Sequence, residues 1–132
     1  MSRTAERAIR GTGYRLTSPR KSVVEAMERA QPCSIEDLCA ALPGVGRATV
    51  FRTMKLLQDL DVVCRVPLED GTVRYQLATG GHHHHLVCRD CGTVTEFADI
   101  DIDRRIEAQA ESTGFELAGH SVELYGVCAS CR

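Results

Sequence analysis

The segment GGHHHHLVCRDCG, residues 80–92, places four consecutive histidines just ahead of a Cys-x-x-Cys pair. Imidazole nitrogen and thiolate sulfur are common ligands of zinc and related transition metals. A purification tag would also contain a histidine run, but tags lie at chain ends, and this run lies within sequence that has the pattern of a folded domain. The segment therefore predicts metal sites whose remaining ligands come from elsewhere in the chain.

A second Cys-x-x-Cys pair, Cys128 and Cys131, follows the first pair, Cys88 and Cys91, after 36 residues. Two such pairs, each at the end of a predicted strand, can close four sulfur atoms tetrahedrally around Zn²⁺ at roughly 2.3 Å. A single pair would suit a redox dithiol equally well, and a disulfide or redox role stays open for both pairs. We expect the four cysteines to hold a structural zinc ion.

The composition is that of an ordinary globular protein, with 43% hydrophobic and 26% charged residues in a chain of 132. This length allows one domain or two small ones. No apolar stretch approaches the roughly 18 residues of a membrane span, and residues 1–15 lack the apolar core of a secretory signal. We therefore expect a cytoplasmic protein, in which seven cysteines indicate metal or redox chemistry more than disulfides.

The formal net charge of −2 hides an asymmetry between the two halves of the chain. Residues 1–61 carry ten Lys and Arg against seven Asp and Glu, whereas residues 62–132 carry six against eleven. A basic first half before an acidic, Cys- and His-rich second half indicates two modules with different partners. A solvated helix face remains the commoner explanation of any single charge cluster.

Apolar residues recur at helical spacing in residues 16–30, 33–42 and 47–61 of the first half. The residues expected to face inward are Val23, Val24, Met27, Ala30, Ile35, Leu38, Cys39, Leu42, Val50, Met54, Leu57 and Leu60. Two short helices, a PGVG break and a basic third helix are typical of a helix-turn-helix motif whose recognition helix comes last.

Local signals support these helices and the element that follows them. Ser18 is the expected N-cap of the first helix with Pro19 as its first residue, and Ser34 and Asp37 form a loose capping box for the second. In residues 62–78, two alternating apolar runs flank EDG, which predicts a β-hairpin and hence a winged helix. A generic helical bundle with a trailing hairpin would give the same pattern.

The second half alternates short strands with one helix. Strands are expected at residues 84–88 and 93–97, an amphipathic helix at 99–113 with Ile102, Ile106 and Ala110 on one face, and further strand within 115–128.

Strand geometry also divides the histidine run. Because successive side chains of a strand point to opposite faces, His82 and His84 share one face and His83 and His85 share the other. The four residues can therefore supply two separate metal sites, unless they form a disordered loop.

The chain resembles the ferric uptake regulator superfamily of bacterial metal-sensing repressors, and within it the zinc uptake regulators. The segments that carry the resemblance are YRLTSPRKSVVEAM, CSIEDLCAAL, GRATVFRTMKLLQDLDVV, HHHHLVCRDCGTVTEF and HSVELYGVCASC. The resemblance implies an α+β fold with a winged helix-turn-helix DNA-binding domain, residues 1–79, and a small α/β metal-binding dimerisation domain, residues 80–132. It implies a homodimer that binds double-stranded operator DNA and represses transcription when its regulatory metal is bound.

The resemblance also assigns metal ligands. It places the structural zinc on the four Cys-x-x-Cys cysteines. For the regulatory metal it implies Cys64, His83, His85 and Glu96. For a third site, inside the dimerisation domain, it implies His82, His84, Asp103 and His120, where Asp103 replaces the usual Glu.

Two departures from the family pattern bear on the identity of the sensed metal. Ala78 replaces a cysteine that actinobacterial zinc regulators carry, and Pro32 replaces a histidine that iron and peroxide sensors carry. The thiolate of Cys64 favours Zn²⁺ as the regulatory metal. Fe²⁺, manganese, nickel or peroxide sensing remains the alternative, as do a packing role for Cys64 and a place for Cys33 or Gln76 in the regulatory site.

The third helix of the motif carries the expected DNA-reading residues. Phe51, where the family usually has Tyr, and Arg52 are expected to face bases, while Arg15 and Arg20 are expected to contact phosphates and Thr49 either group. Core packing is the alternative for Phe51.

Two other classes of protein could also contain such cysteines and histidines. A thiol redox enzyme would need a thioredoxin-like βαβ context, which the sequence lacks, so we do not expect an enzyme. A zinc carrier without DNA binding is disfavoured by the basic first half and by the ATVFRTMKLL helix.

Overall fold

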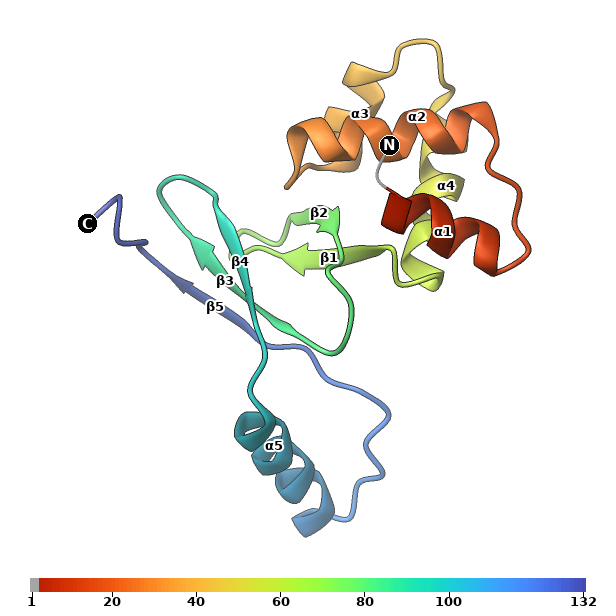
Figure 1. The fold of residues 1–132 in the computed structure, drawn as a ribbon. Coiled ribbons are helices and arrows are strands. Elements are labelled where there is room, and N and C mark those ends of the chain that lie inside the picture. The colour runs from red at the N-terminus through yellow and green to blue at the C-terminus, as the bar shows by residue number, and fades with distance from the viewer. Residues whose placement is uncertain (1–2) are drawn as a thin grey trace. The chain divides into compact units, whose positions relative to one another are not determined.

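The computed structural model describes residues 3–132, apart from the side chain of Thr4. The chain divides into two compact units, residues 1–80 and 81–132, called here the N-terminal and the C-terminal unit. Figure 1 shows helices predominating in the first and a small sheet in the second. Within the described residues, no helix has the length and apolar character needed to cross a bilayer.

The N-terminal unit is built on four helices, α1 (Arg3–Gly11), α2 (Ser18–Ala30), α3 (Ile35–Ala41) and α4 (Arg47–Asp59). The three helices predicted from apolar spacing are confirmed as α2, α3 and α4. Helix α1 was not predicted, although its residues Ala5 and Ile9 are buried in the core of this unit. Its nine residues carry few apolar side chains, so the periodic signal is weak.

The helix caps follow the predicted chemistry with one shift. The N-cap of α2 is Thr17, not Ser18, because the Thr17 hydroxyl accepts a hydrogen bond from the backbone N–H of Arg20. The capping box of α3 is confirmed: Ser34 Oγ accepts from the Asp37 N–H at 3.0 Å, and Asp37 Oδ2 accepts from the Ser34 N–H at 2.9 Å. These bonds satisfy amide groups that the first turn would otherwise leave unpaired.

The predicted inward residues form the core of this unit with one exception. Val23, Val24 and Met27 of α2 are buried, but Ala30 is exposed and Ala26 is buried instead. Ala30 is the last residue of the helix, where the chain turns away from the core. The predicted inward residues of α3 and α4 are all buried in this core or packed against it.

The expected hairpin follows α4. Strands β1 (Val63–Pro67) and β2 (Val73–Leu77) pair antiparallel, and Gly71 in the connecting turn has a φ of +84°, a left-handed conformation that favours glycine. The helices hold this wing in place. Arg74 Nη1 donates to Asp37 Oδ2 of α3 at 2.9 Å, and the backbone of Tyr75 pairs with that of Cys33.

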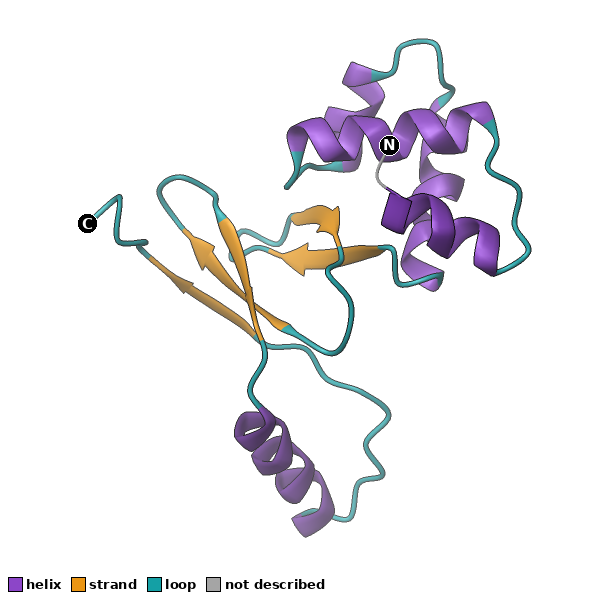
Figure 2. Ribbon diagram, viewed as in Figure 1, coloured by secondary structure: helices purple, strands orange, loops and turns teal. Residues whose placement is uncertain are grey.

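The C-terminal unit contains β3 (His84–Cys88), β4 (Val94–Phe97), α5 (Ile100–Ser112) and β5 (Glu123–Gly126). The strands form one sheet in the order β4-β3-β5, in which β3 pairs antiparallel with β4 and parallel with β5 (Figure 2). The predicted strands and helix are present, although the strand expected within residues 115–128 is confined to β5. Together the two units confirm the expected α+β fold, a winged helix-turn-helix followed by a small α/β domain.

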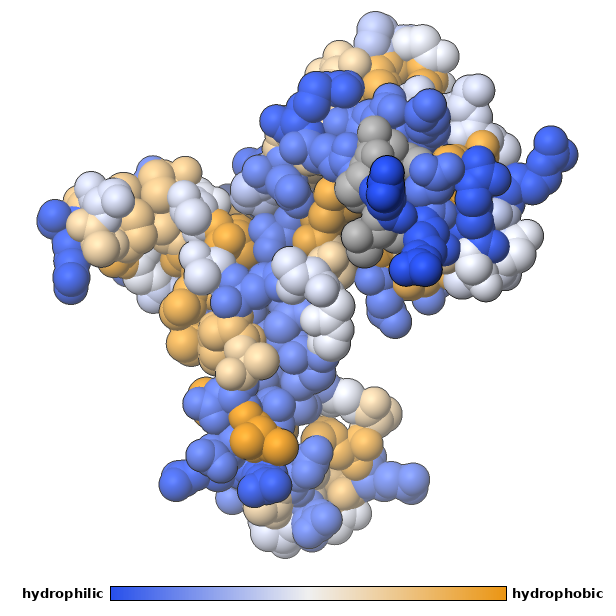
Figure 3. All heavy atoms as spheres, viewed as in Figure 1, coloured by the Kyte–Doolittle hydropathy of each residue, from blue (hydrophilic) through white to orange (hydrophobic). Residues whose placement is uncertain are grey.

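The C-terminal unit buries few apolar side chains. No residue of α5 is buried, and its predicted inward residues Ile102, Ile106 and Ala110 are only half-buried. Leu86 and Leu124 on the sheet and Phe115 after α5 are exposed, and apolar patches interrupt the polar surface of this unit in Figure 3. A single copy of this unit therefore leaves several large apolar side chains exposed to water.

Cys33 offers a test of the N-terminal core. Its side chain is buried, and this burial, with the charge of Asp37, raises the pKa of the thiol to about 11. We expect Cys33→Ser to lower the free energy of unfolding by roughly 1–3 kcal/mol, because it buries a hydroxyl among apolar groups, and Cys33→Ala to cost less. Urea unfolding of both variants measures this. A variant of unchanged stability that has lost its metal response would instead make Cys33 a metal ligand.

Candidate metal centres

The four Cys-x-x-Cys cysteines come together although 36 residues separate the pairs. Cys88 ends β3, Cys91 follows in the turn to β4, and Cys128 and Cys131 lie in the turn after β5. Their sulfur atoms all lie within 4.8 Å of one another, and Cys91 Sγ lies 3.8 Å from Cys128 Sγ. A tetrahedral zinc site with bonds of roughly 2.3 Å has S···S edges of about 3.8 Å. The geometry therefore fits a Cys₄ zinc site.

The backbone around these cysteines prepares the thiolates. The N–H groups of Cys91 and Cys128 point at Cys88 Sγ and lower the pKa of this thiol to about 6. In contrast, hydrogen bonds to Cys128 and then Cys91 raise the pKa of Cys131 to about 12. Four sulfur atoms this close can all be thiolates only with a cation between them. A bound metal ion would be that cation.

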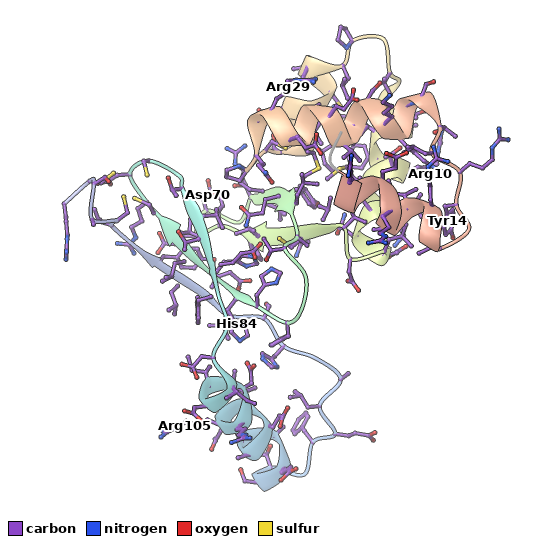
Figure 4. The ribbon with its side chains drawn as sticks, in the orientation of Figure 1. Arg10, Tyr14, Arg29, Asp70, His84 and Arg105 are labelled. Carbon is purple, nitrogen blue, oxygen red and sulfur yellow. The ribbon has the colours of Figure 1, made fainter. Side chains whose placement is uncertain are left out.

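A second cluster joins β3 to α5. Asp103 Oδ1 lies 2.7 Å from His84 Nε2, 3.1 Å from His120 Nε2 and 3.3 Å from His82 Nε2. Figure 4 labels His84, where side chains of the sheet meet those of the helix. Hydrogen bonding to His84, and then to His120, lowers the pKa of Asp103. Three imidazole nitrogens around one carboxylate oxygen are a donor set that suits zinc or another divalent transition metal.

The alternate histidines form a separate cluster on the other face. His83 Nε2 lies 3.6 Å from Glu96 Oε1, and the rings of His83 and His85 are 5.0 Å apart. Burial, and then the nearby His83, lowers the pKa of His85, which favours the neutral ring that binds metals. The two faces of β3 thus present two groups of ligands, each within 4.8 Å.

The remaining cysteines belong to the N-terminal unit. Cys64 is half-buried on β1, where its thiol donates to the carbonyl of Gln76 at 3.5 Å. Gln76 is its partner across the hairpin. Cys33 is buried in the core and Cys39 packs against it, in agreement with the inward position predicted for Cys39. A place for Cys64 in the regulatory metal site stays a prediction.

One acidic residue of the sheet, Glu123, lies beside these ligands although the sequence did not predict it there. Glu123 Oε1, on β5, lies 3.9 Å from His85 Nδ1, and its side chain is largely buried. The register that pairs Glu123 with His85 depends on how β5 docks against β3. In the sequence, the only available sign was an acidic residue in an otherwise apolar strand.

The exposed face of α4 carries the predicted DNA-reading residues. Phe51 is 46% exposed, which excludes the core-packing alternative, and Arg52 is exposed with Nη2 3.4 Å from Thr49 Oγ1. The guanidinium of Arg47 lies 5.4 Å from the centre of the Phe51 ring and is paired with Glu36 of α3. This stacked arrangement was not foreseen, because it depends on the packing of α3 against α4.

The predicted phosphate contacts lie near the start of α2. Arg20 Nη1 donates to the carbonyl of Arg15 at 2.6 Å, and its guanidinium lies 5.7 Å from the centre of the Tyr14 ring. Figure 4 labels the exposed Tyr14 beyond the end of α1. Arg20 is thus positioned by the segment that also carries Arg15.

Comparison with known proteins identifies the family that shares this architecture. The model of the Ferric uptake regulator family matches residues 11–125. The chain belongs to this family. It is 33% identical over 130 residues to the ferric uptake regulation protein of Bordetella parapertussis, covering 94% of each chain. Among solved structures, it is similar to a zinc uptake regulator in complex with zinc and DNA, with a TM-score of 0.82, 26% identity, and coverage of 96% of this chain and 89% of the other. The Vibrio cholerae ferric uptake regulator gives a TM-score of 0.65 at 36% identity, with coverage of 93% and 98%.

Membership of the family fixes the general activity. Ferric uptake regulator family proteins are metal-responsive transcription regulators and not enzymes, so the same holds for this chain. The clusters of Cys, His and acidic side chains fit a divalent metal cofactor.

The Cys₄ cluster can be tested by removing one sulfur. We expect Cys131→Ser to lose one equivalent of zinc per chain and to abolish stable folding or dimerisation, because metal binding at such a site contributes folding energy directly. Zinc content by mass spectrometry and the melting temperature measure this. Cys39→Ser, which alters a cysteine outside every cluster, is the matched control for zinc content and should keep all of its zinc. Full zinc content and an unchanged melting temperature in Cys131→Ser would refute a structural zinc site.

Proposed function

We propose that the protein is a zinc-sensing repressor that binds operator DNA as a homodimer when its regulatory metal is bound. The observation that carries the proposal is the division of the histidine run into two ligand groups on opposite faces of β3. One group, His83 and His85 with Glu96, has the donors of a regulatory site. In this proposal the protein works in the cytoplasm and represses uptake genes when zinc is plentiful.

The choice of zinc depends on the fourth ligand. His83, His85 and Glu96 would suit several divalent metals, including Fe²⁺ and Mn²⁺. We propose Cys64 as the remaining ligand, and its thiolate favours zinc. The likeness to a zinc uptake regulator bound to zinc and DNA supports this choice. Iron, manganese, nickel or peroxide sensing is the alternative, supported by the ferric uptake regulation proteins among the relatives.

The proposed mechanism follows from where the ligands lie in the chain. Cys64 belongs to the wing of the N-terminal unit, whereas His83, His85 and Glu96 belong to the C-terminal unit. A metal ion that all four hold would restrict how the two units move relative to each other. In a dimer it would thereby fix the spacing of the two α4 helices. Metal that binds this arrangement better than others shifts the population toward it, and paired DNA half-sites select that spacing.

We propose the Cys₄ cluster as a structural zinc site and the cluster of His82, His84, Asp103 and His120 as a third metal site. Both lie within residues 81–132. The Cys₄ cluster lies at the ends of β3 and β5, and the other cluster joins β3 to α5. Such positions suit ions that stabilise the dimerisation domain rather than ions that link the two units.

The dimer is proposed from the surface of the C-terminal unit. Leu86 and Leu124 are neighbours in register on β3 and β5, and both are exposed on the same face of the sheet. This face borders an apolar cavity of about 240 Å³, and α5 has no buried residue. A second copy would cover this surface, as in the symmetric dimers that dominate soluble assemblies.

For DNA, we propose α4 as the helix that enters the major groove. Phe51 and Arg52 would face bases, with Thr49 beside Arg52, and the exposed Phe51 ring can contact thymine methyl groups. Arg15 and Arg20 would contact phosphates. Such contacts strengthen binding but carry no sequence information.

The division of the histidine run predicts different phenotypes for neighbouring residues. We expect His83→Ala to abolish zinc-dependent operator binding while fold and dimer survive, and Cys64→Ser to do the same. His82→Ala, the matched neighbour, should still respond to zinc, with a weaker response. Fluorescence anisotropy of labelled operator during zinc titration measures this.

Two results would contradict this prediction. Identical curves for His82→Ala and His83→Ala would mean that the run serves one site. A wild-type curve for Cys64→Ser would exclude Cys64 as a metal ligand, and with it the main argument for zinc over iron.

Mutations of the phosphate contacts and of the base contacts should also have different effects on DNA binding. We expect Arg20→Ala to weaken binding to operator and random DNA about equally and to reduce the salt slope by about one, because it removes a phosphate contact. Arg52→Ala should cost roughly 1–3 kcal/mol of discrimination between operator and random DNA. Binding isotherms for both DNAs at several salt concentrations measure this. An equal operator-to-random ratio in the two mutants would refute the assignment.

A further inference from the structure

Three residues form a row across the sheet of the C-terminal unit. His85 on the central strand β3 pairs in register with Glu96 of β4 on one side and with Glu123 of β5 on the other. Side chains directly opposite each other on neighbouring strands share a face of the sheet. The imidazole of His85 is therefore flanked by two carboxylates, of which only Glu96 belongs to the proposed regulatory metal site.

The ring of His85 lacks the partners that a buried imidazole requires. The residue is 5% exposed, and neither Nδ1 nor Nε2 has a hydrogen-bond partner among the described residues. Buried polar groups without partners are costly, so such atoms commonly mark a missing ligand. The acidic oxygen near Nδ1 is Glu123 Oε1, at 3.9 Å, and the Glu123 side chain is 12% exposed.

The neighbouring histidine shows the arrangement in completed form. His83 Nδ1 lies 3.1 Å from the carbonyl oxygen of Gly81, and its Nε2 points toward Glu96, 3.6 Å away. One ring nitrogen thus has a backbone acceptor and the other faces the cluster. Metal-binding histidines commonly donate the N–H of their second nitrogen to a carbonyl or carboxylate, which fixes the tautomer and makes the ligand more basic.

We infer that Glu123 is a positioning residue of the regulatory site, which accepts the Nδ1–H of His85 while His85 Nε2 faces the metal. This inference rests on the proposed regulatory site. A shift of about 1 Å closes the present separation to a hydrogen bond. Glu123 would then do for His85 what the Gly81 carbonyl does for His83.

The sheet also separates Glu123 from Glu96, the carboxylate that would bind the metal. Neighbouring strands lie about 4.8 Å apart, so the backbones of Glu96 and Glu123, on either side of β3, are roughly 9–10 Å apart. His83 gathers with Glu96 on one side of the row. Glu123 lies on the other side, outside the cluster that contains His83 and Glu96, and its carboxylate is near Nδ1 of His85. It would therefore act on a bound metal only through that ring.

The test compares Glu123→Leu, which removes the acceptor, with Glu123→Gln, which keeps an acceptor oxygen but loses the charge. Both are made in the full chain with the Cys₄ zinc retained and with His120→Ala present to remove the third site. Glu116→Gln, an exposed glutamate after α5, is the matched control. Zinc affinity is measured by competition with a chelator, and Co²⁺ serves as a visible probe of the ligand set.

We expect Glu123→Leu to weaken zinc binding about 10–100-fold and Glu123→Gln about tenfold, with no change in the control. The Co²⁺ bands should keep their positions and intensities, because the ligands themselves are unchanged. A merely structural role would lower the melting temperature of the form holding only the Cys₄ zinc, and we expect that temperature to be unchanged.

Wild-type zinc affinity in either Glu123 variant would overturn the inference, and the Gln variant decides if the Leu variant does not fold. Altered Co²⁺ bands in both would also overturn it, because Glu123 would then be a direct ligand. His83→Ala in the same background separates this failure from failure of the proposed function. If His83→Ala retains the zinc, the regulatory site is wrong whatever Glu123 does.

Discussion

Adjacent side chains of an extended strand point to opposite faces, and the metal chemistry of this chain depends on that constraint. The four histidines are the last two residues before β3 and its first two residues, so the alternation sends His82 and His84 toward α5 and sends His83 and His85 to the other face. Each face then completes its own set of ligands, from Asp103 and His120 in one case and from Glu96 in the other. One short segment thus contributes to two clusters that have no residue in common.

Each of the two units is stabilised in a different way. The N-terminal unit has a continuous apolar core to which four helices and the wing contribute, and ion pairs such as Arg74 with Asp37 tie the wing to the helices. The C-terminal unit buries Val87 and a few ligands but leaves α5 without a buried residue. Its proposed metal ions and partner subunit therefore replace, in this unit, the stabilisation that a core supplies in the other.

The features that could be predicted from the sequence are those that depend on local spacing. Periodicity identified α2, α3, α4 and α5, the capping box at Ser34 followed from two residue types, and the spacing of the cysteine pairs indicated a tetrahedral cluster that the sulfur positions fit. Features that depend on docking could not be predicted. The pairing of Glu123 with His85 depends on the register of β5, and the stacking of Arg47 on Phe51 depends on α3. The weakly apolar α1 was missed because its burial comes from packing, not from a repeating pattern.

The two cysteine pairs enclose β4, α5 and β5 in one stretch of chain. A metal ion held by both pairs would close this stretch into a loop of 36 residues, whose ends stay together even while the elements inside it open. Joining the ends of such a loop costs an entropy that grows only slowly with its length, and this entropy is lost when the metal binds, before α5 folds. α5, which has no buried residue, would then unfold and refold between fixed ends. Refolding would then involve only the residues between the two cysteine pairs, and not the whole chain.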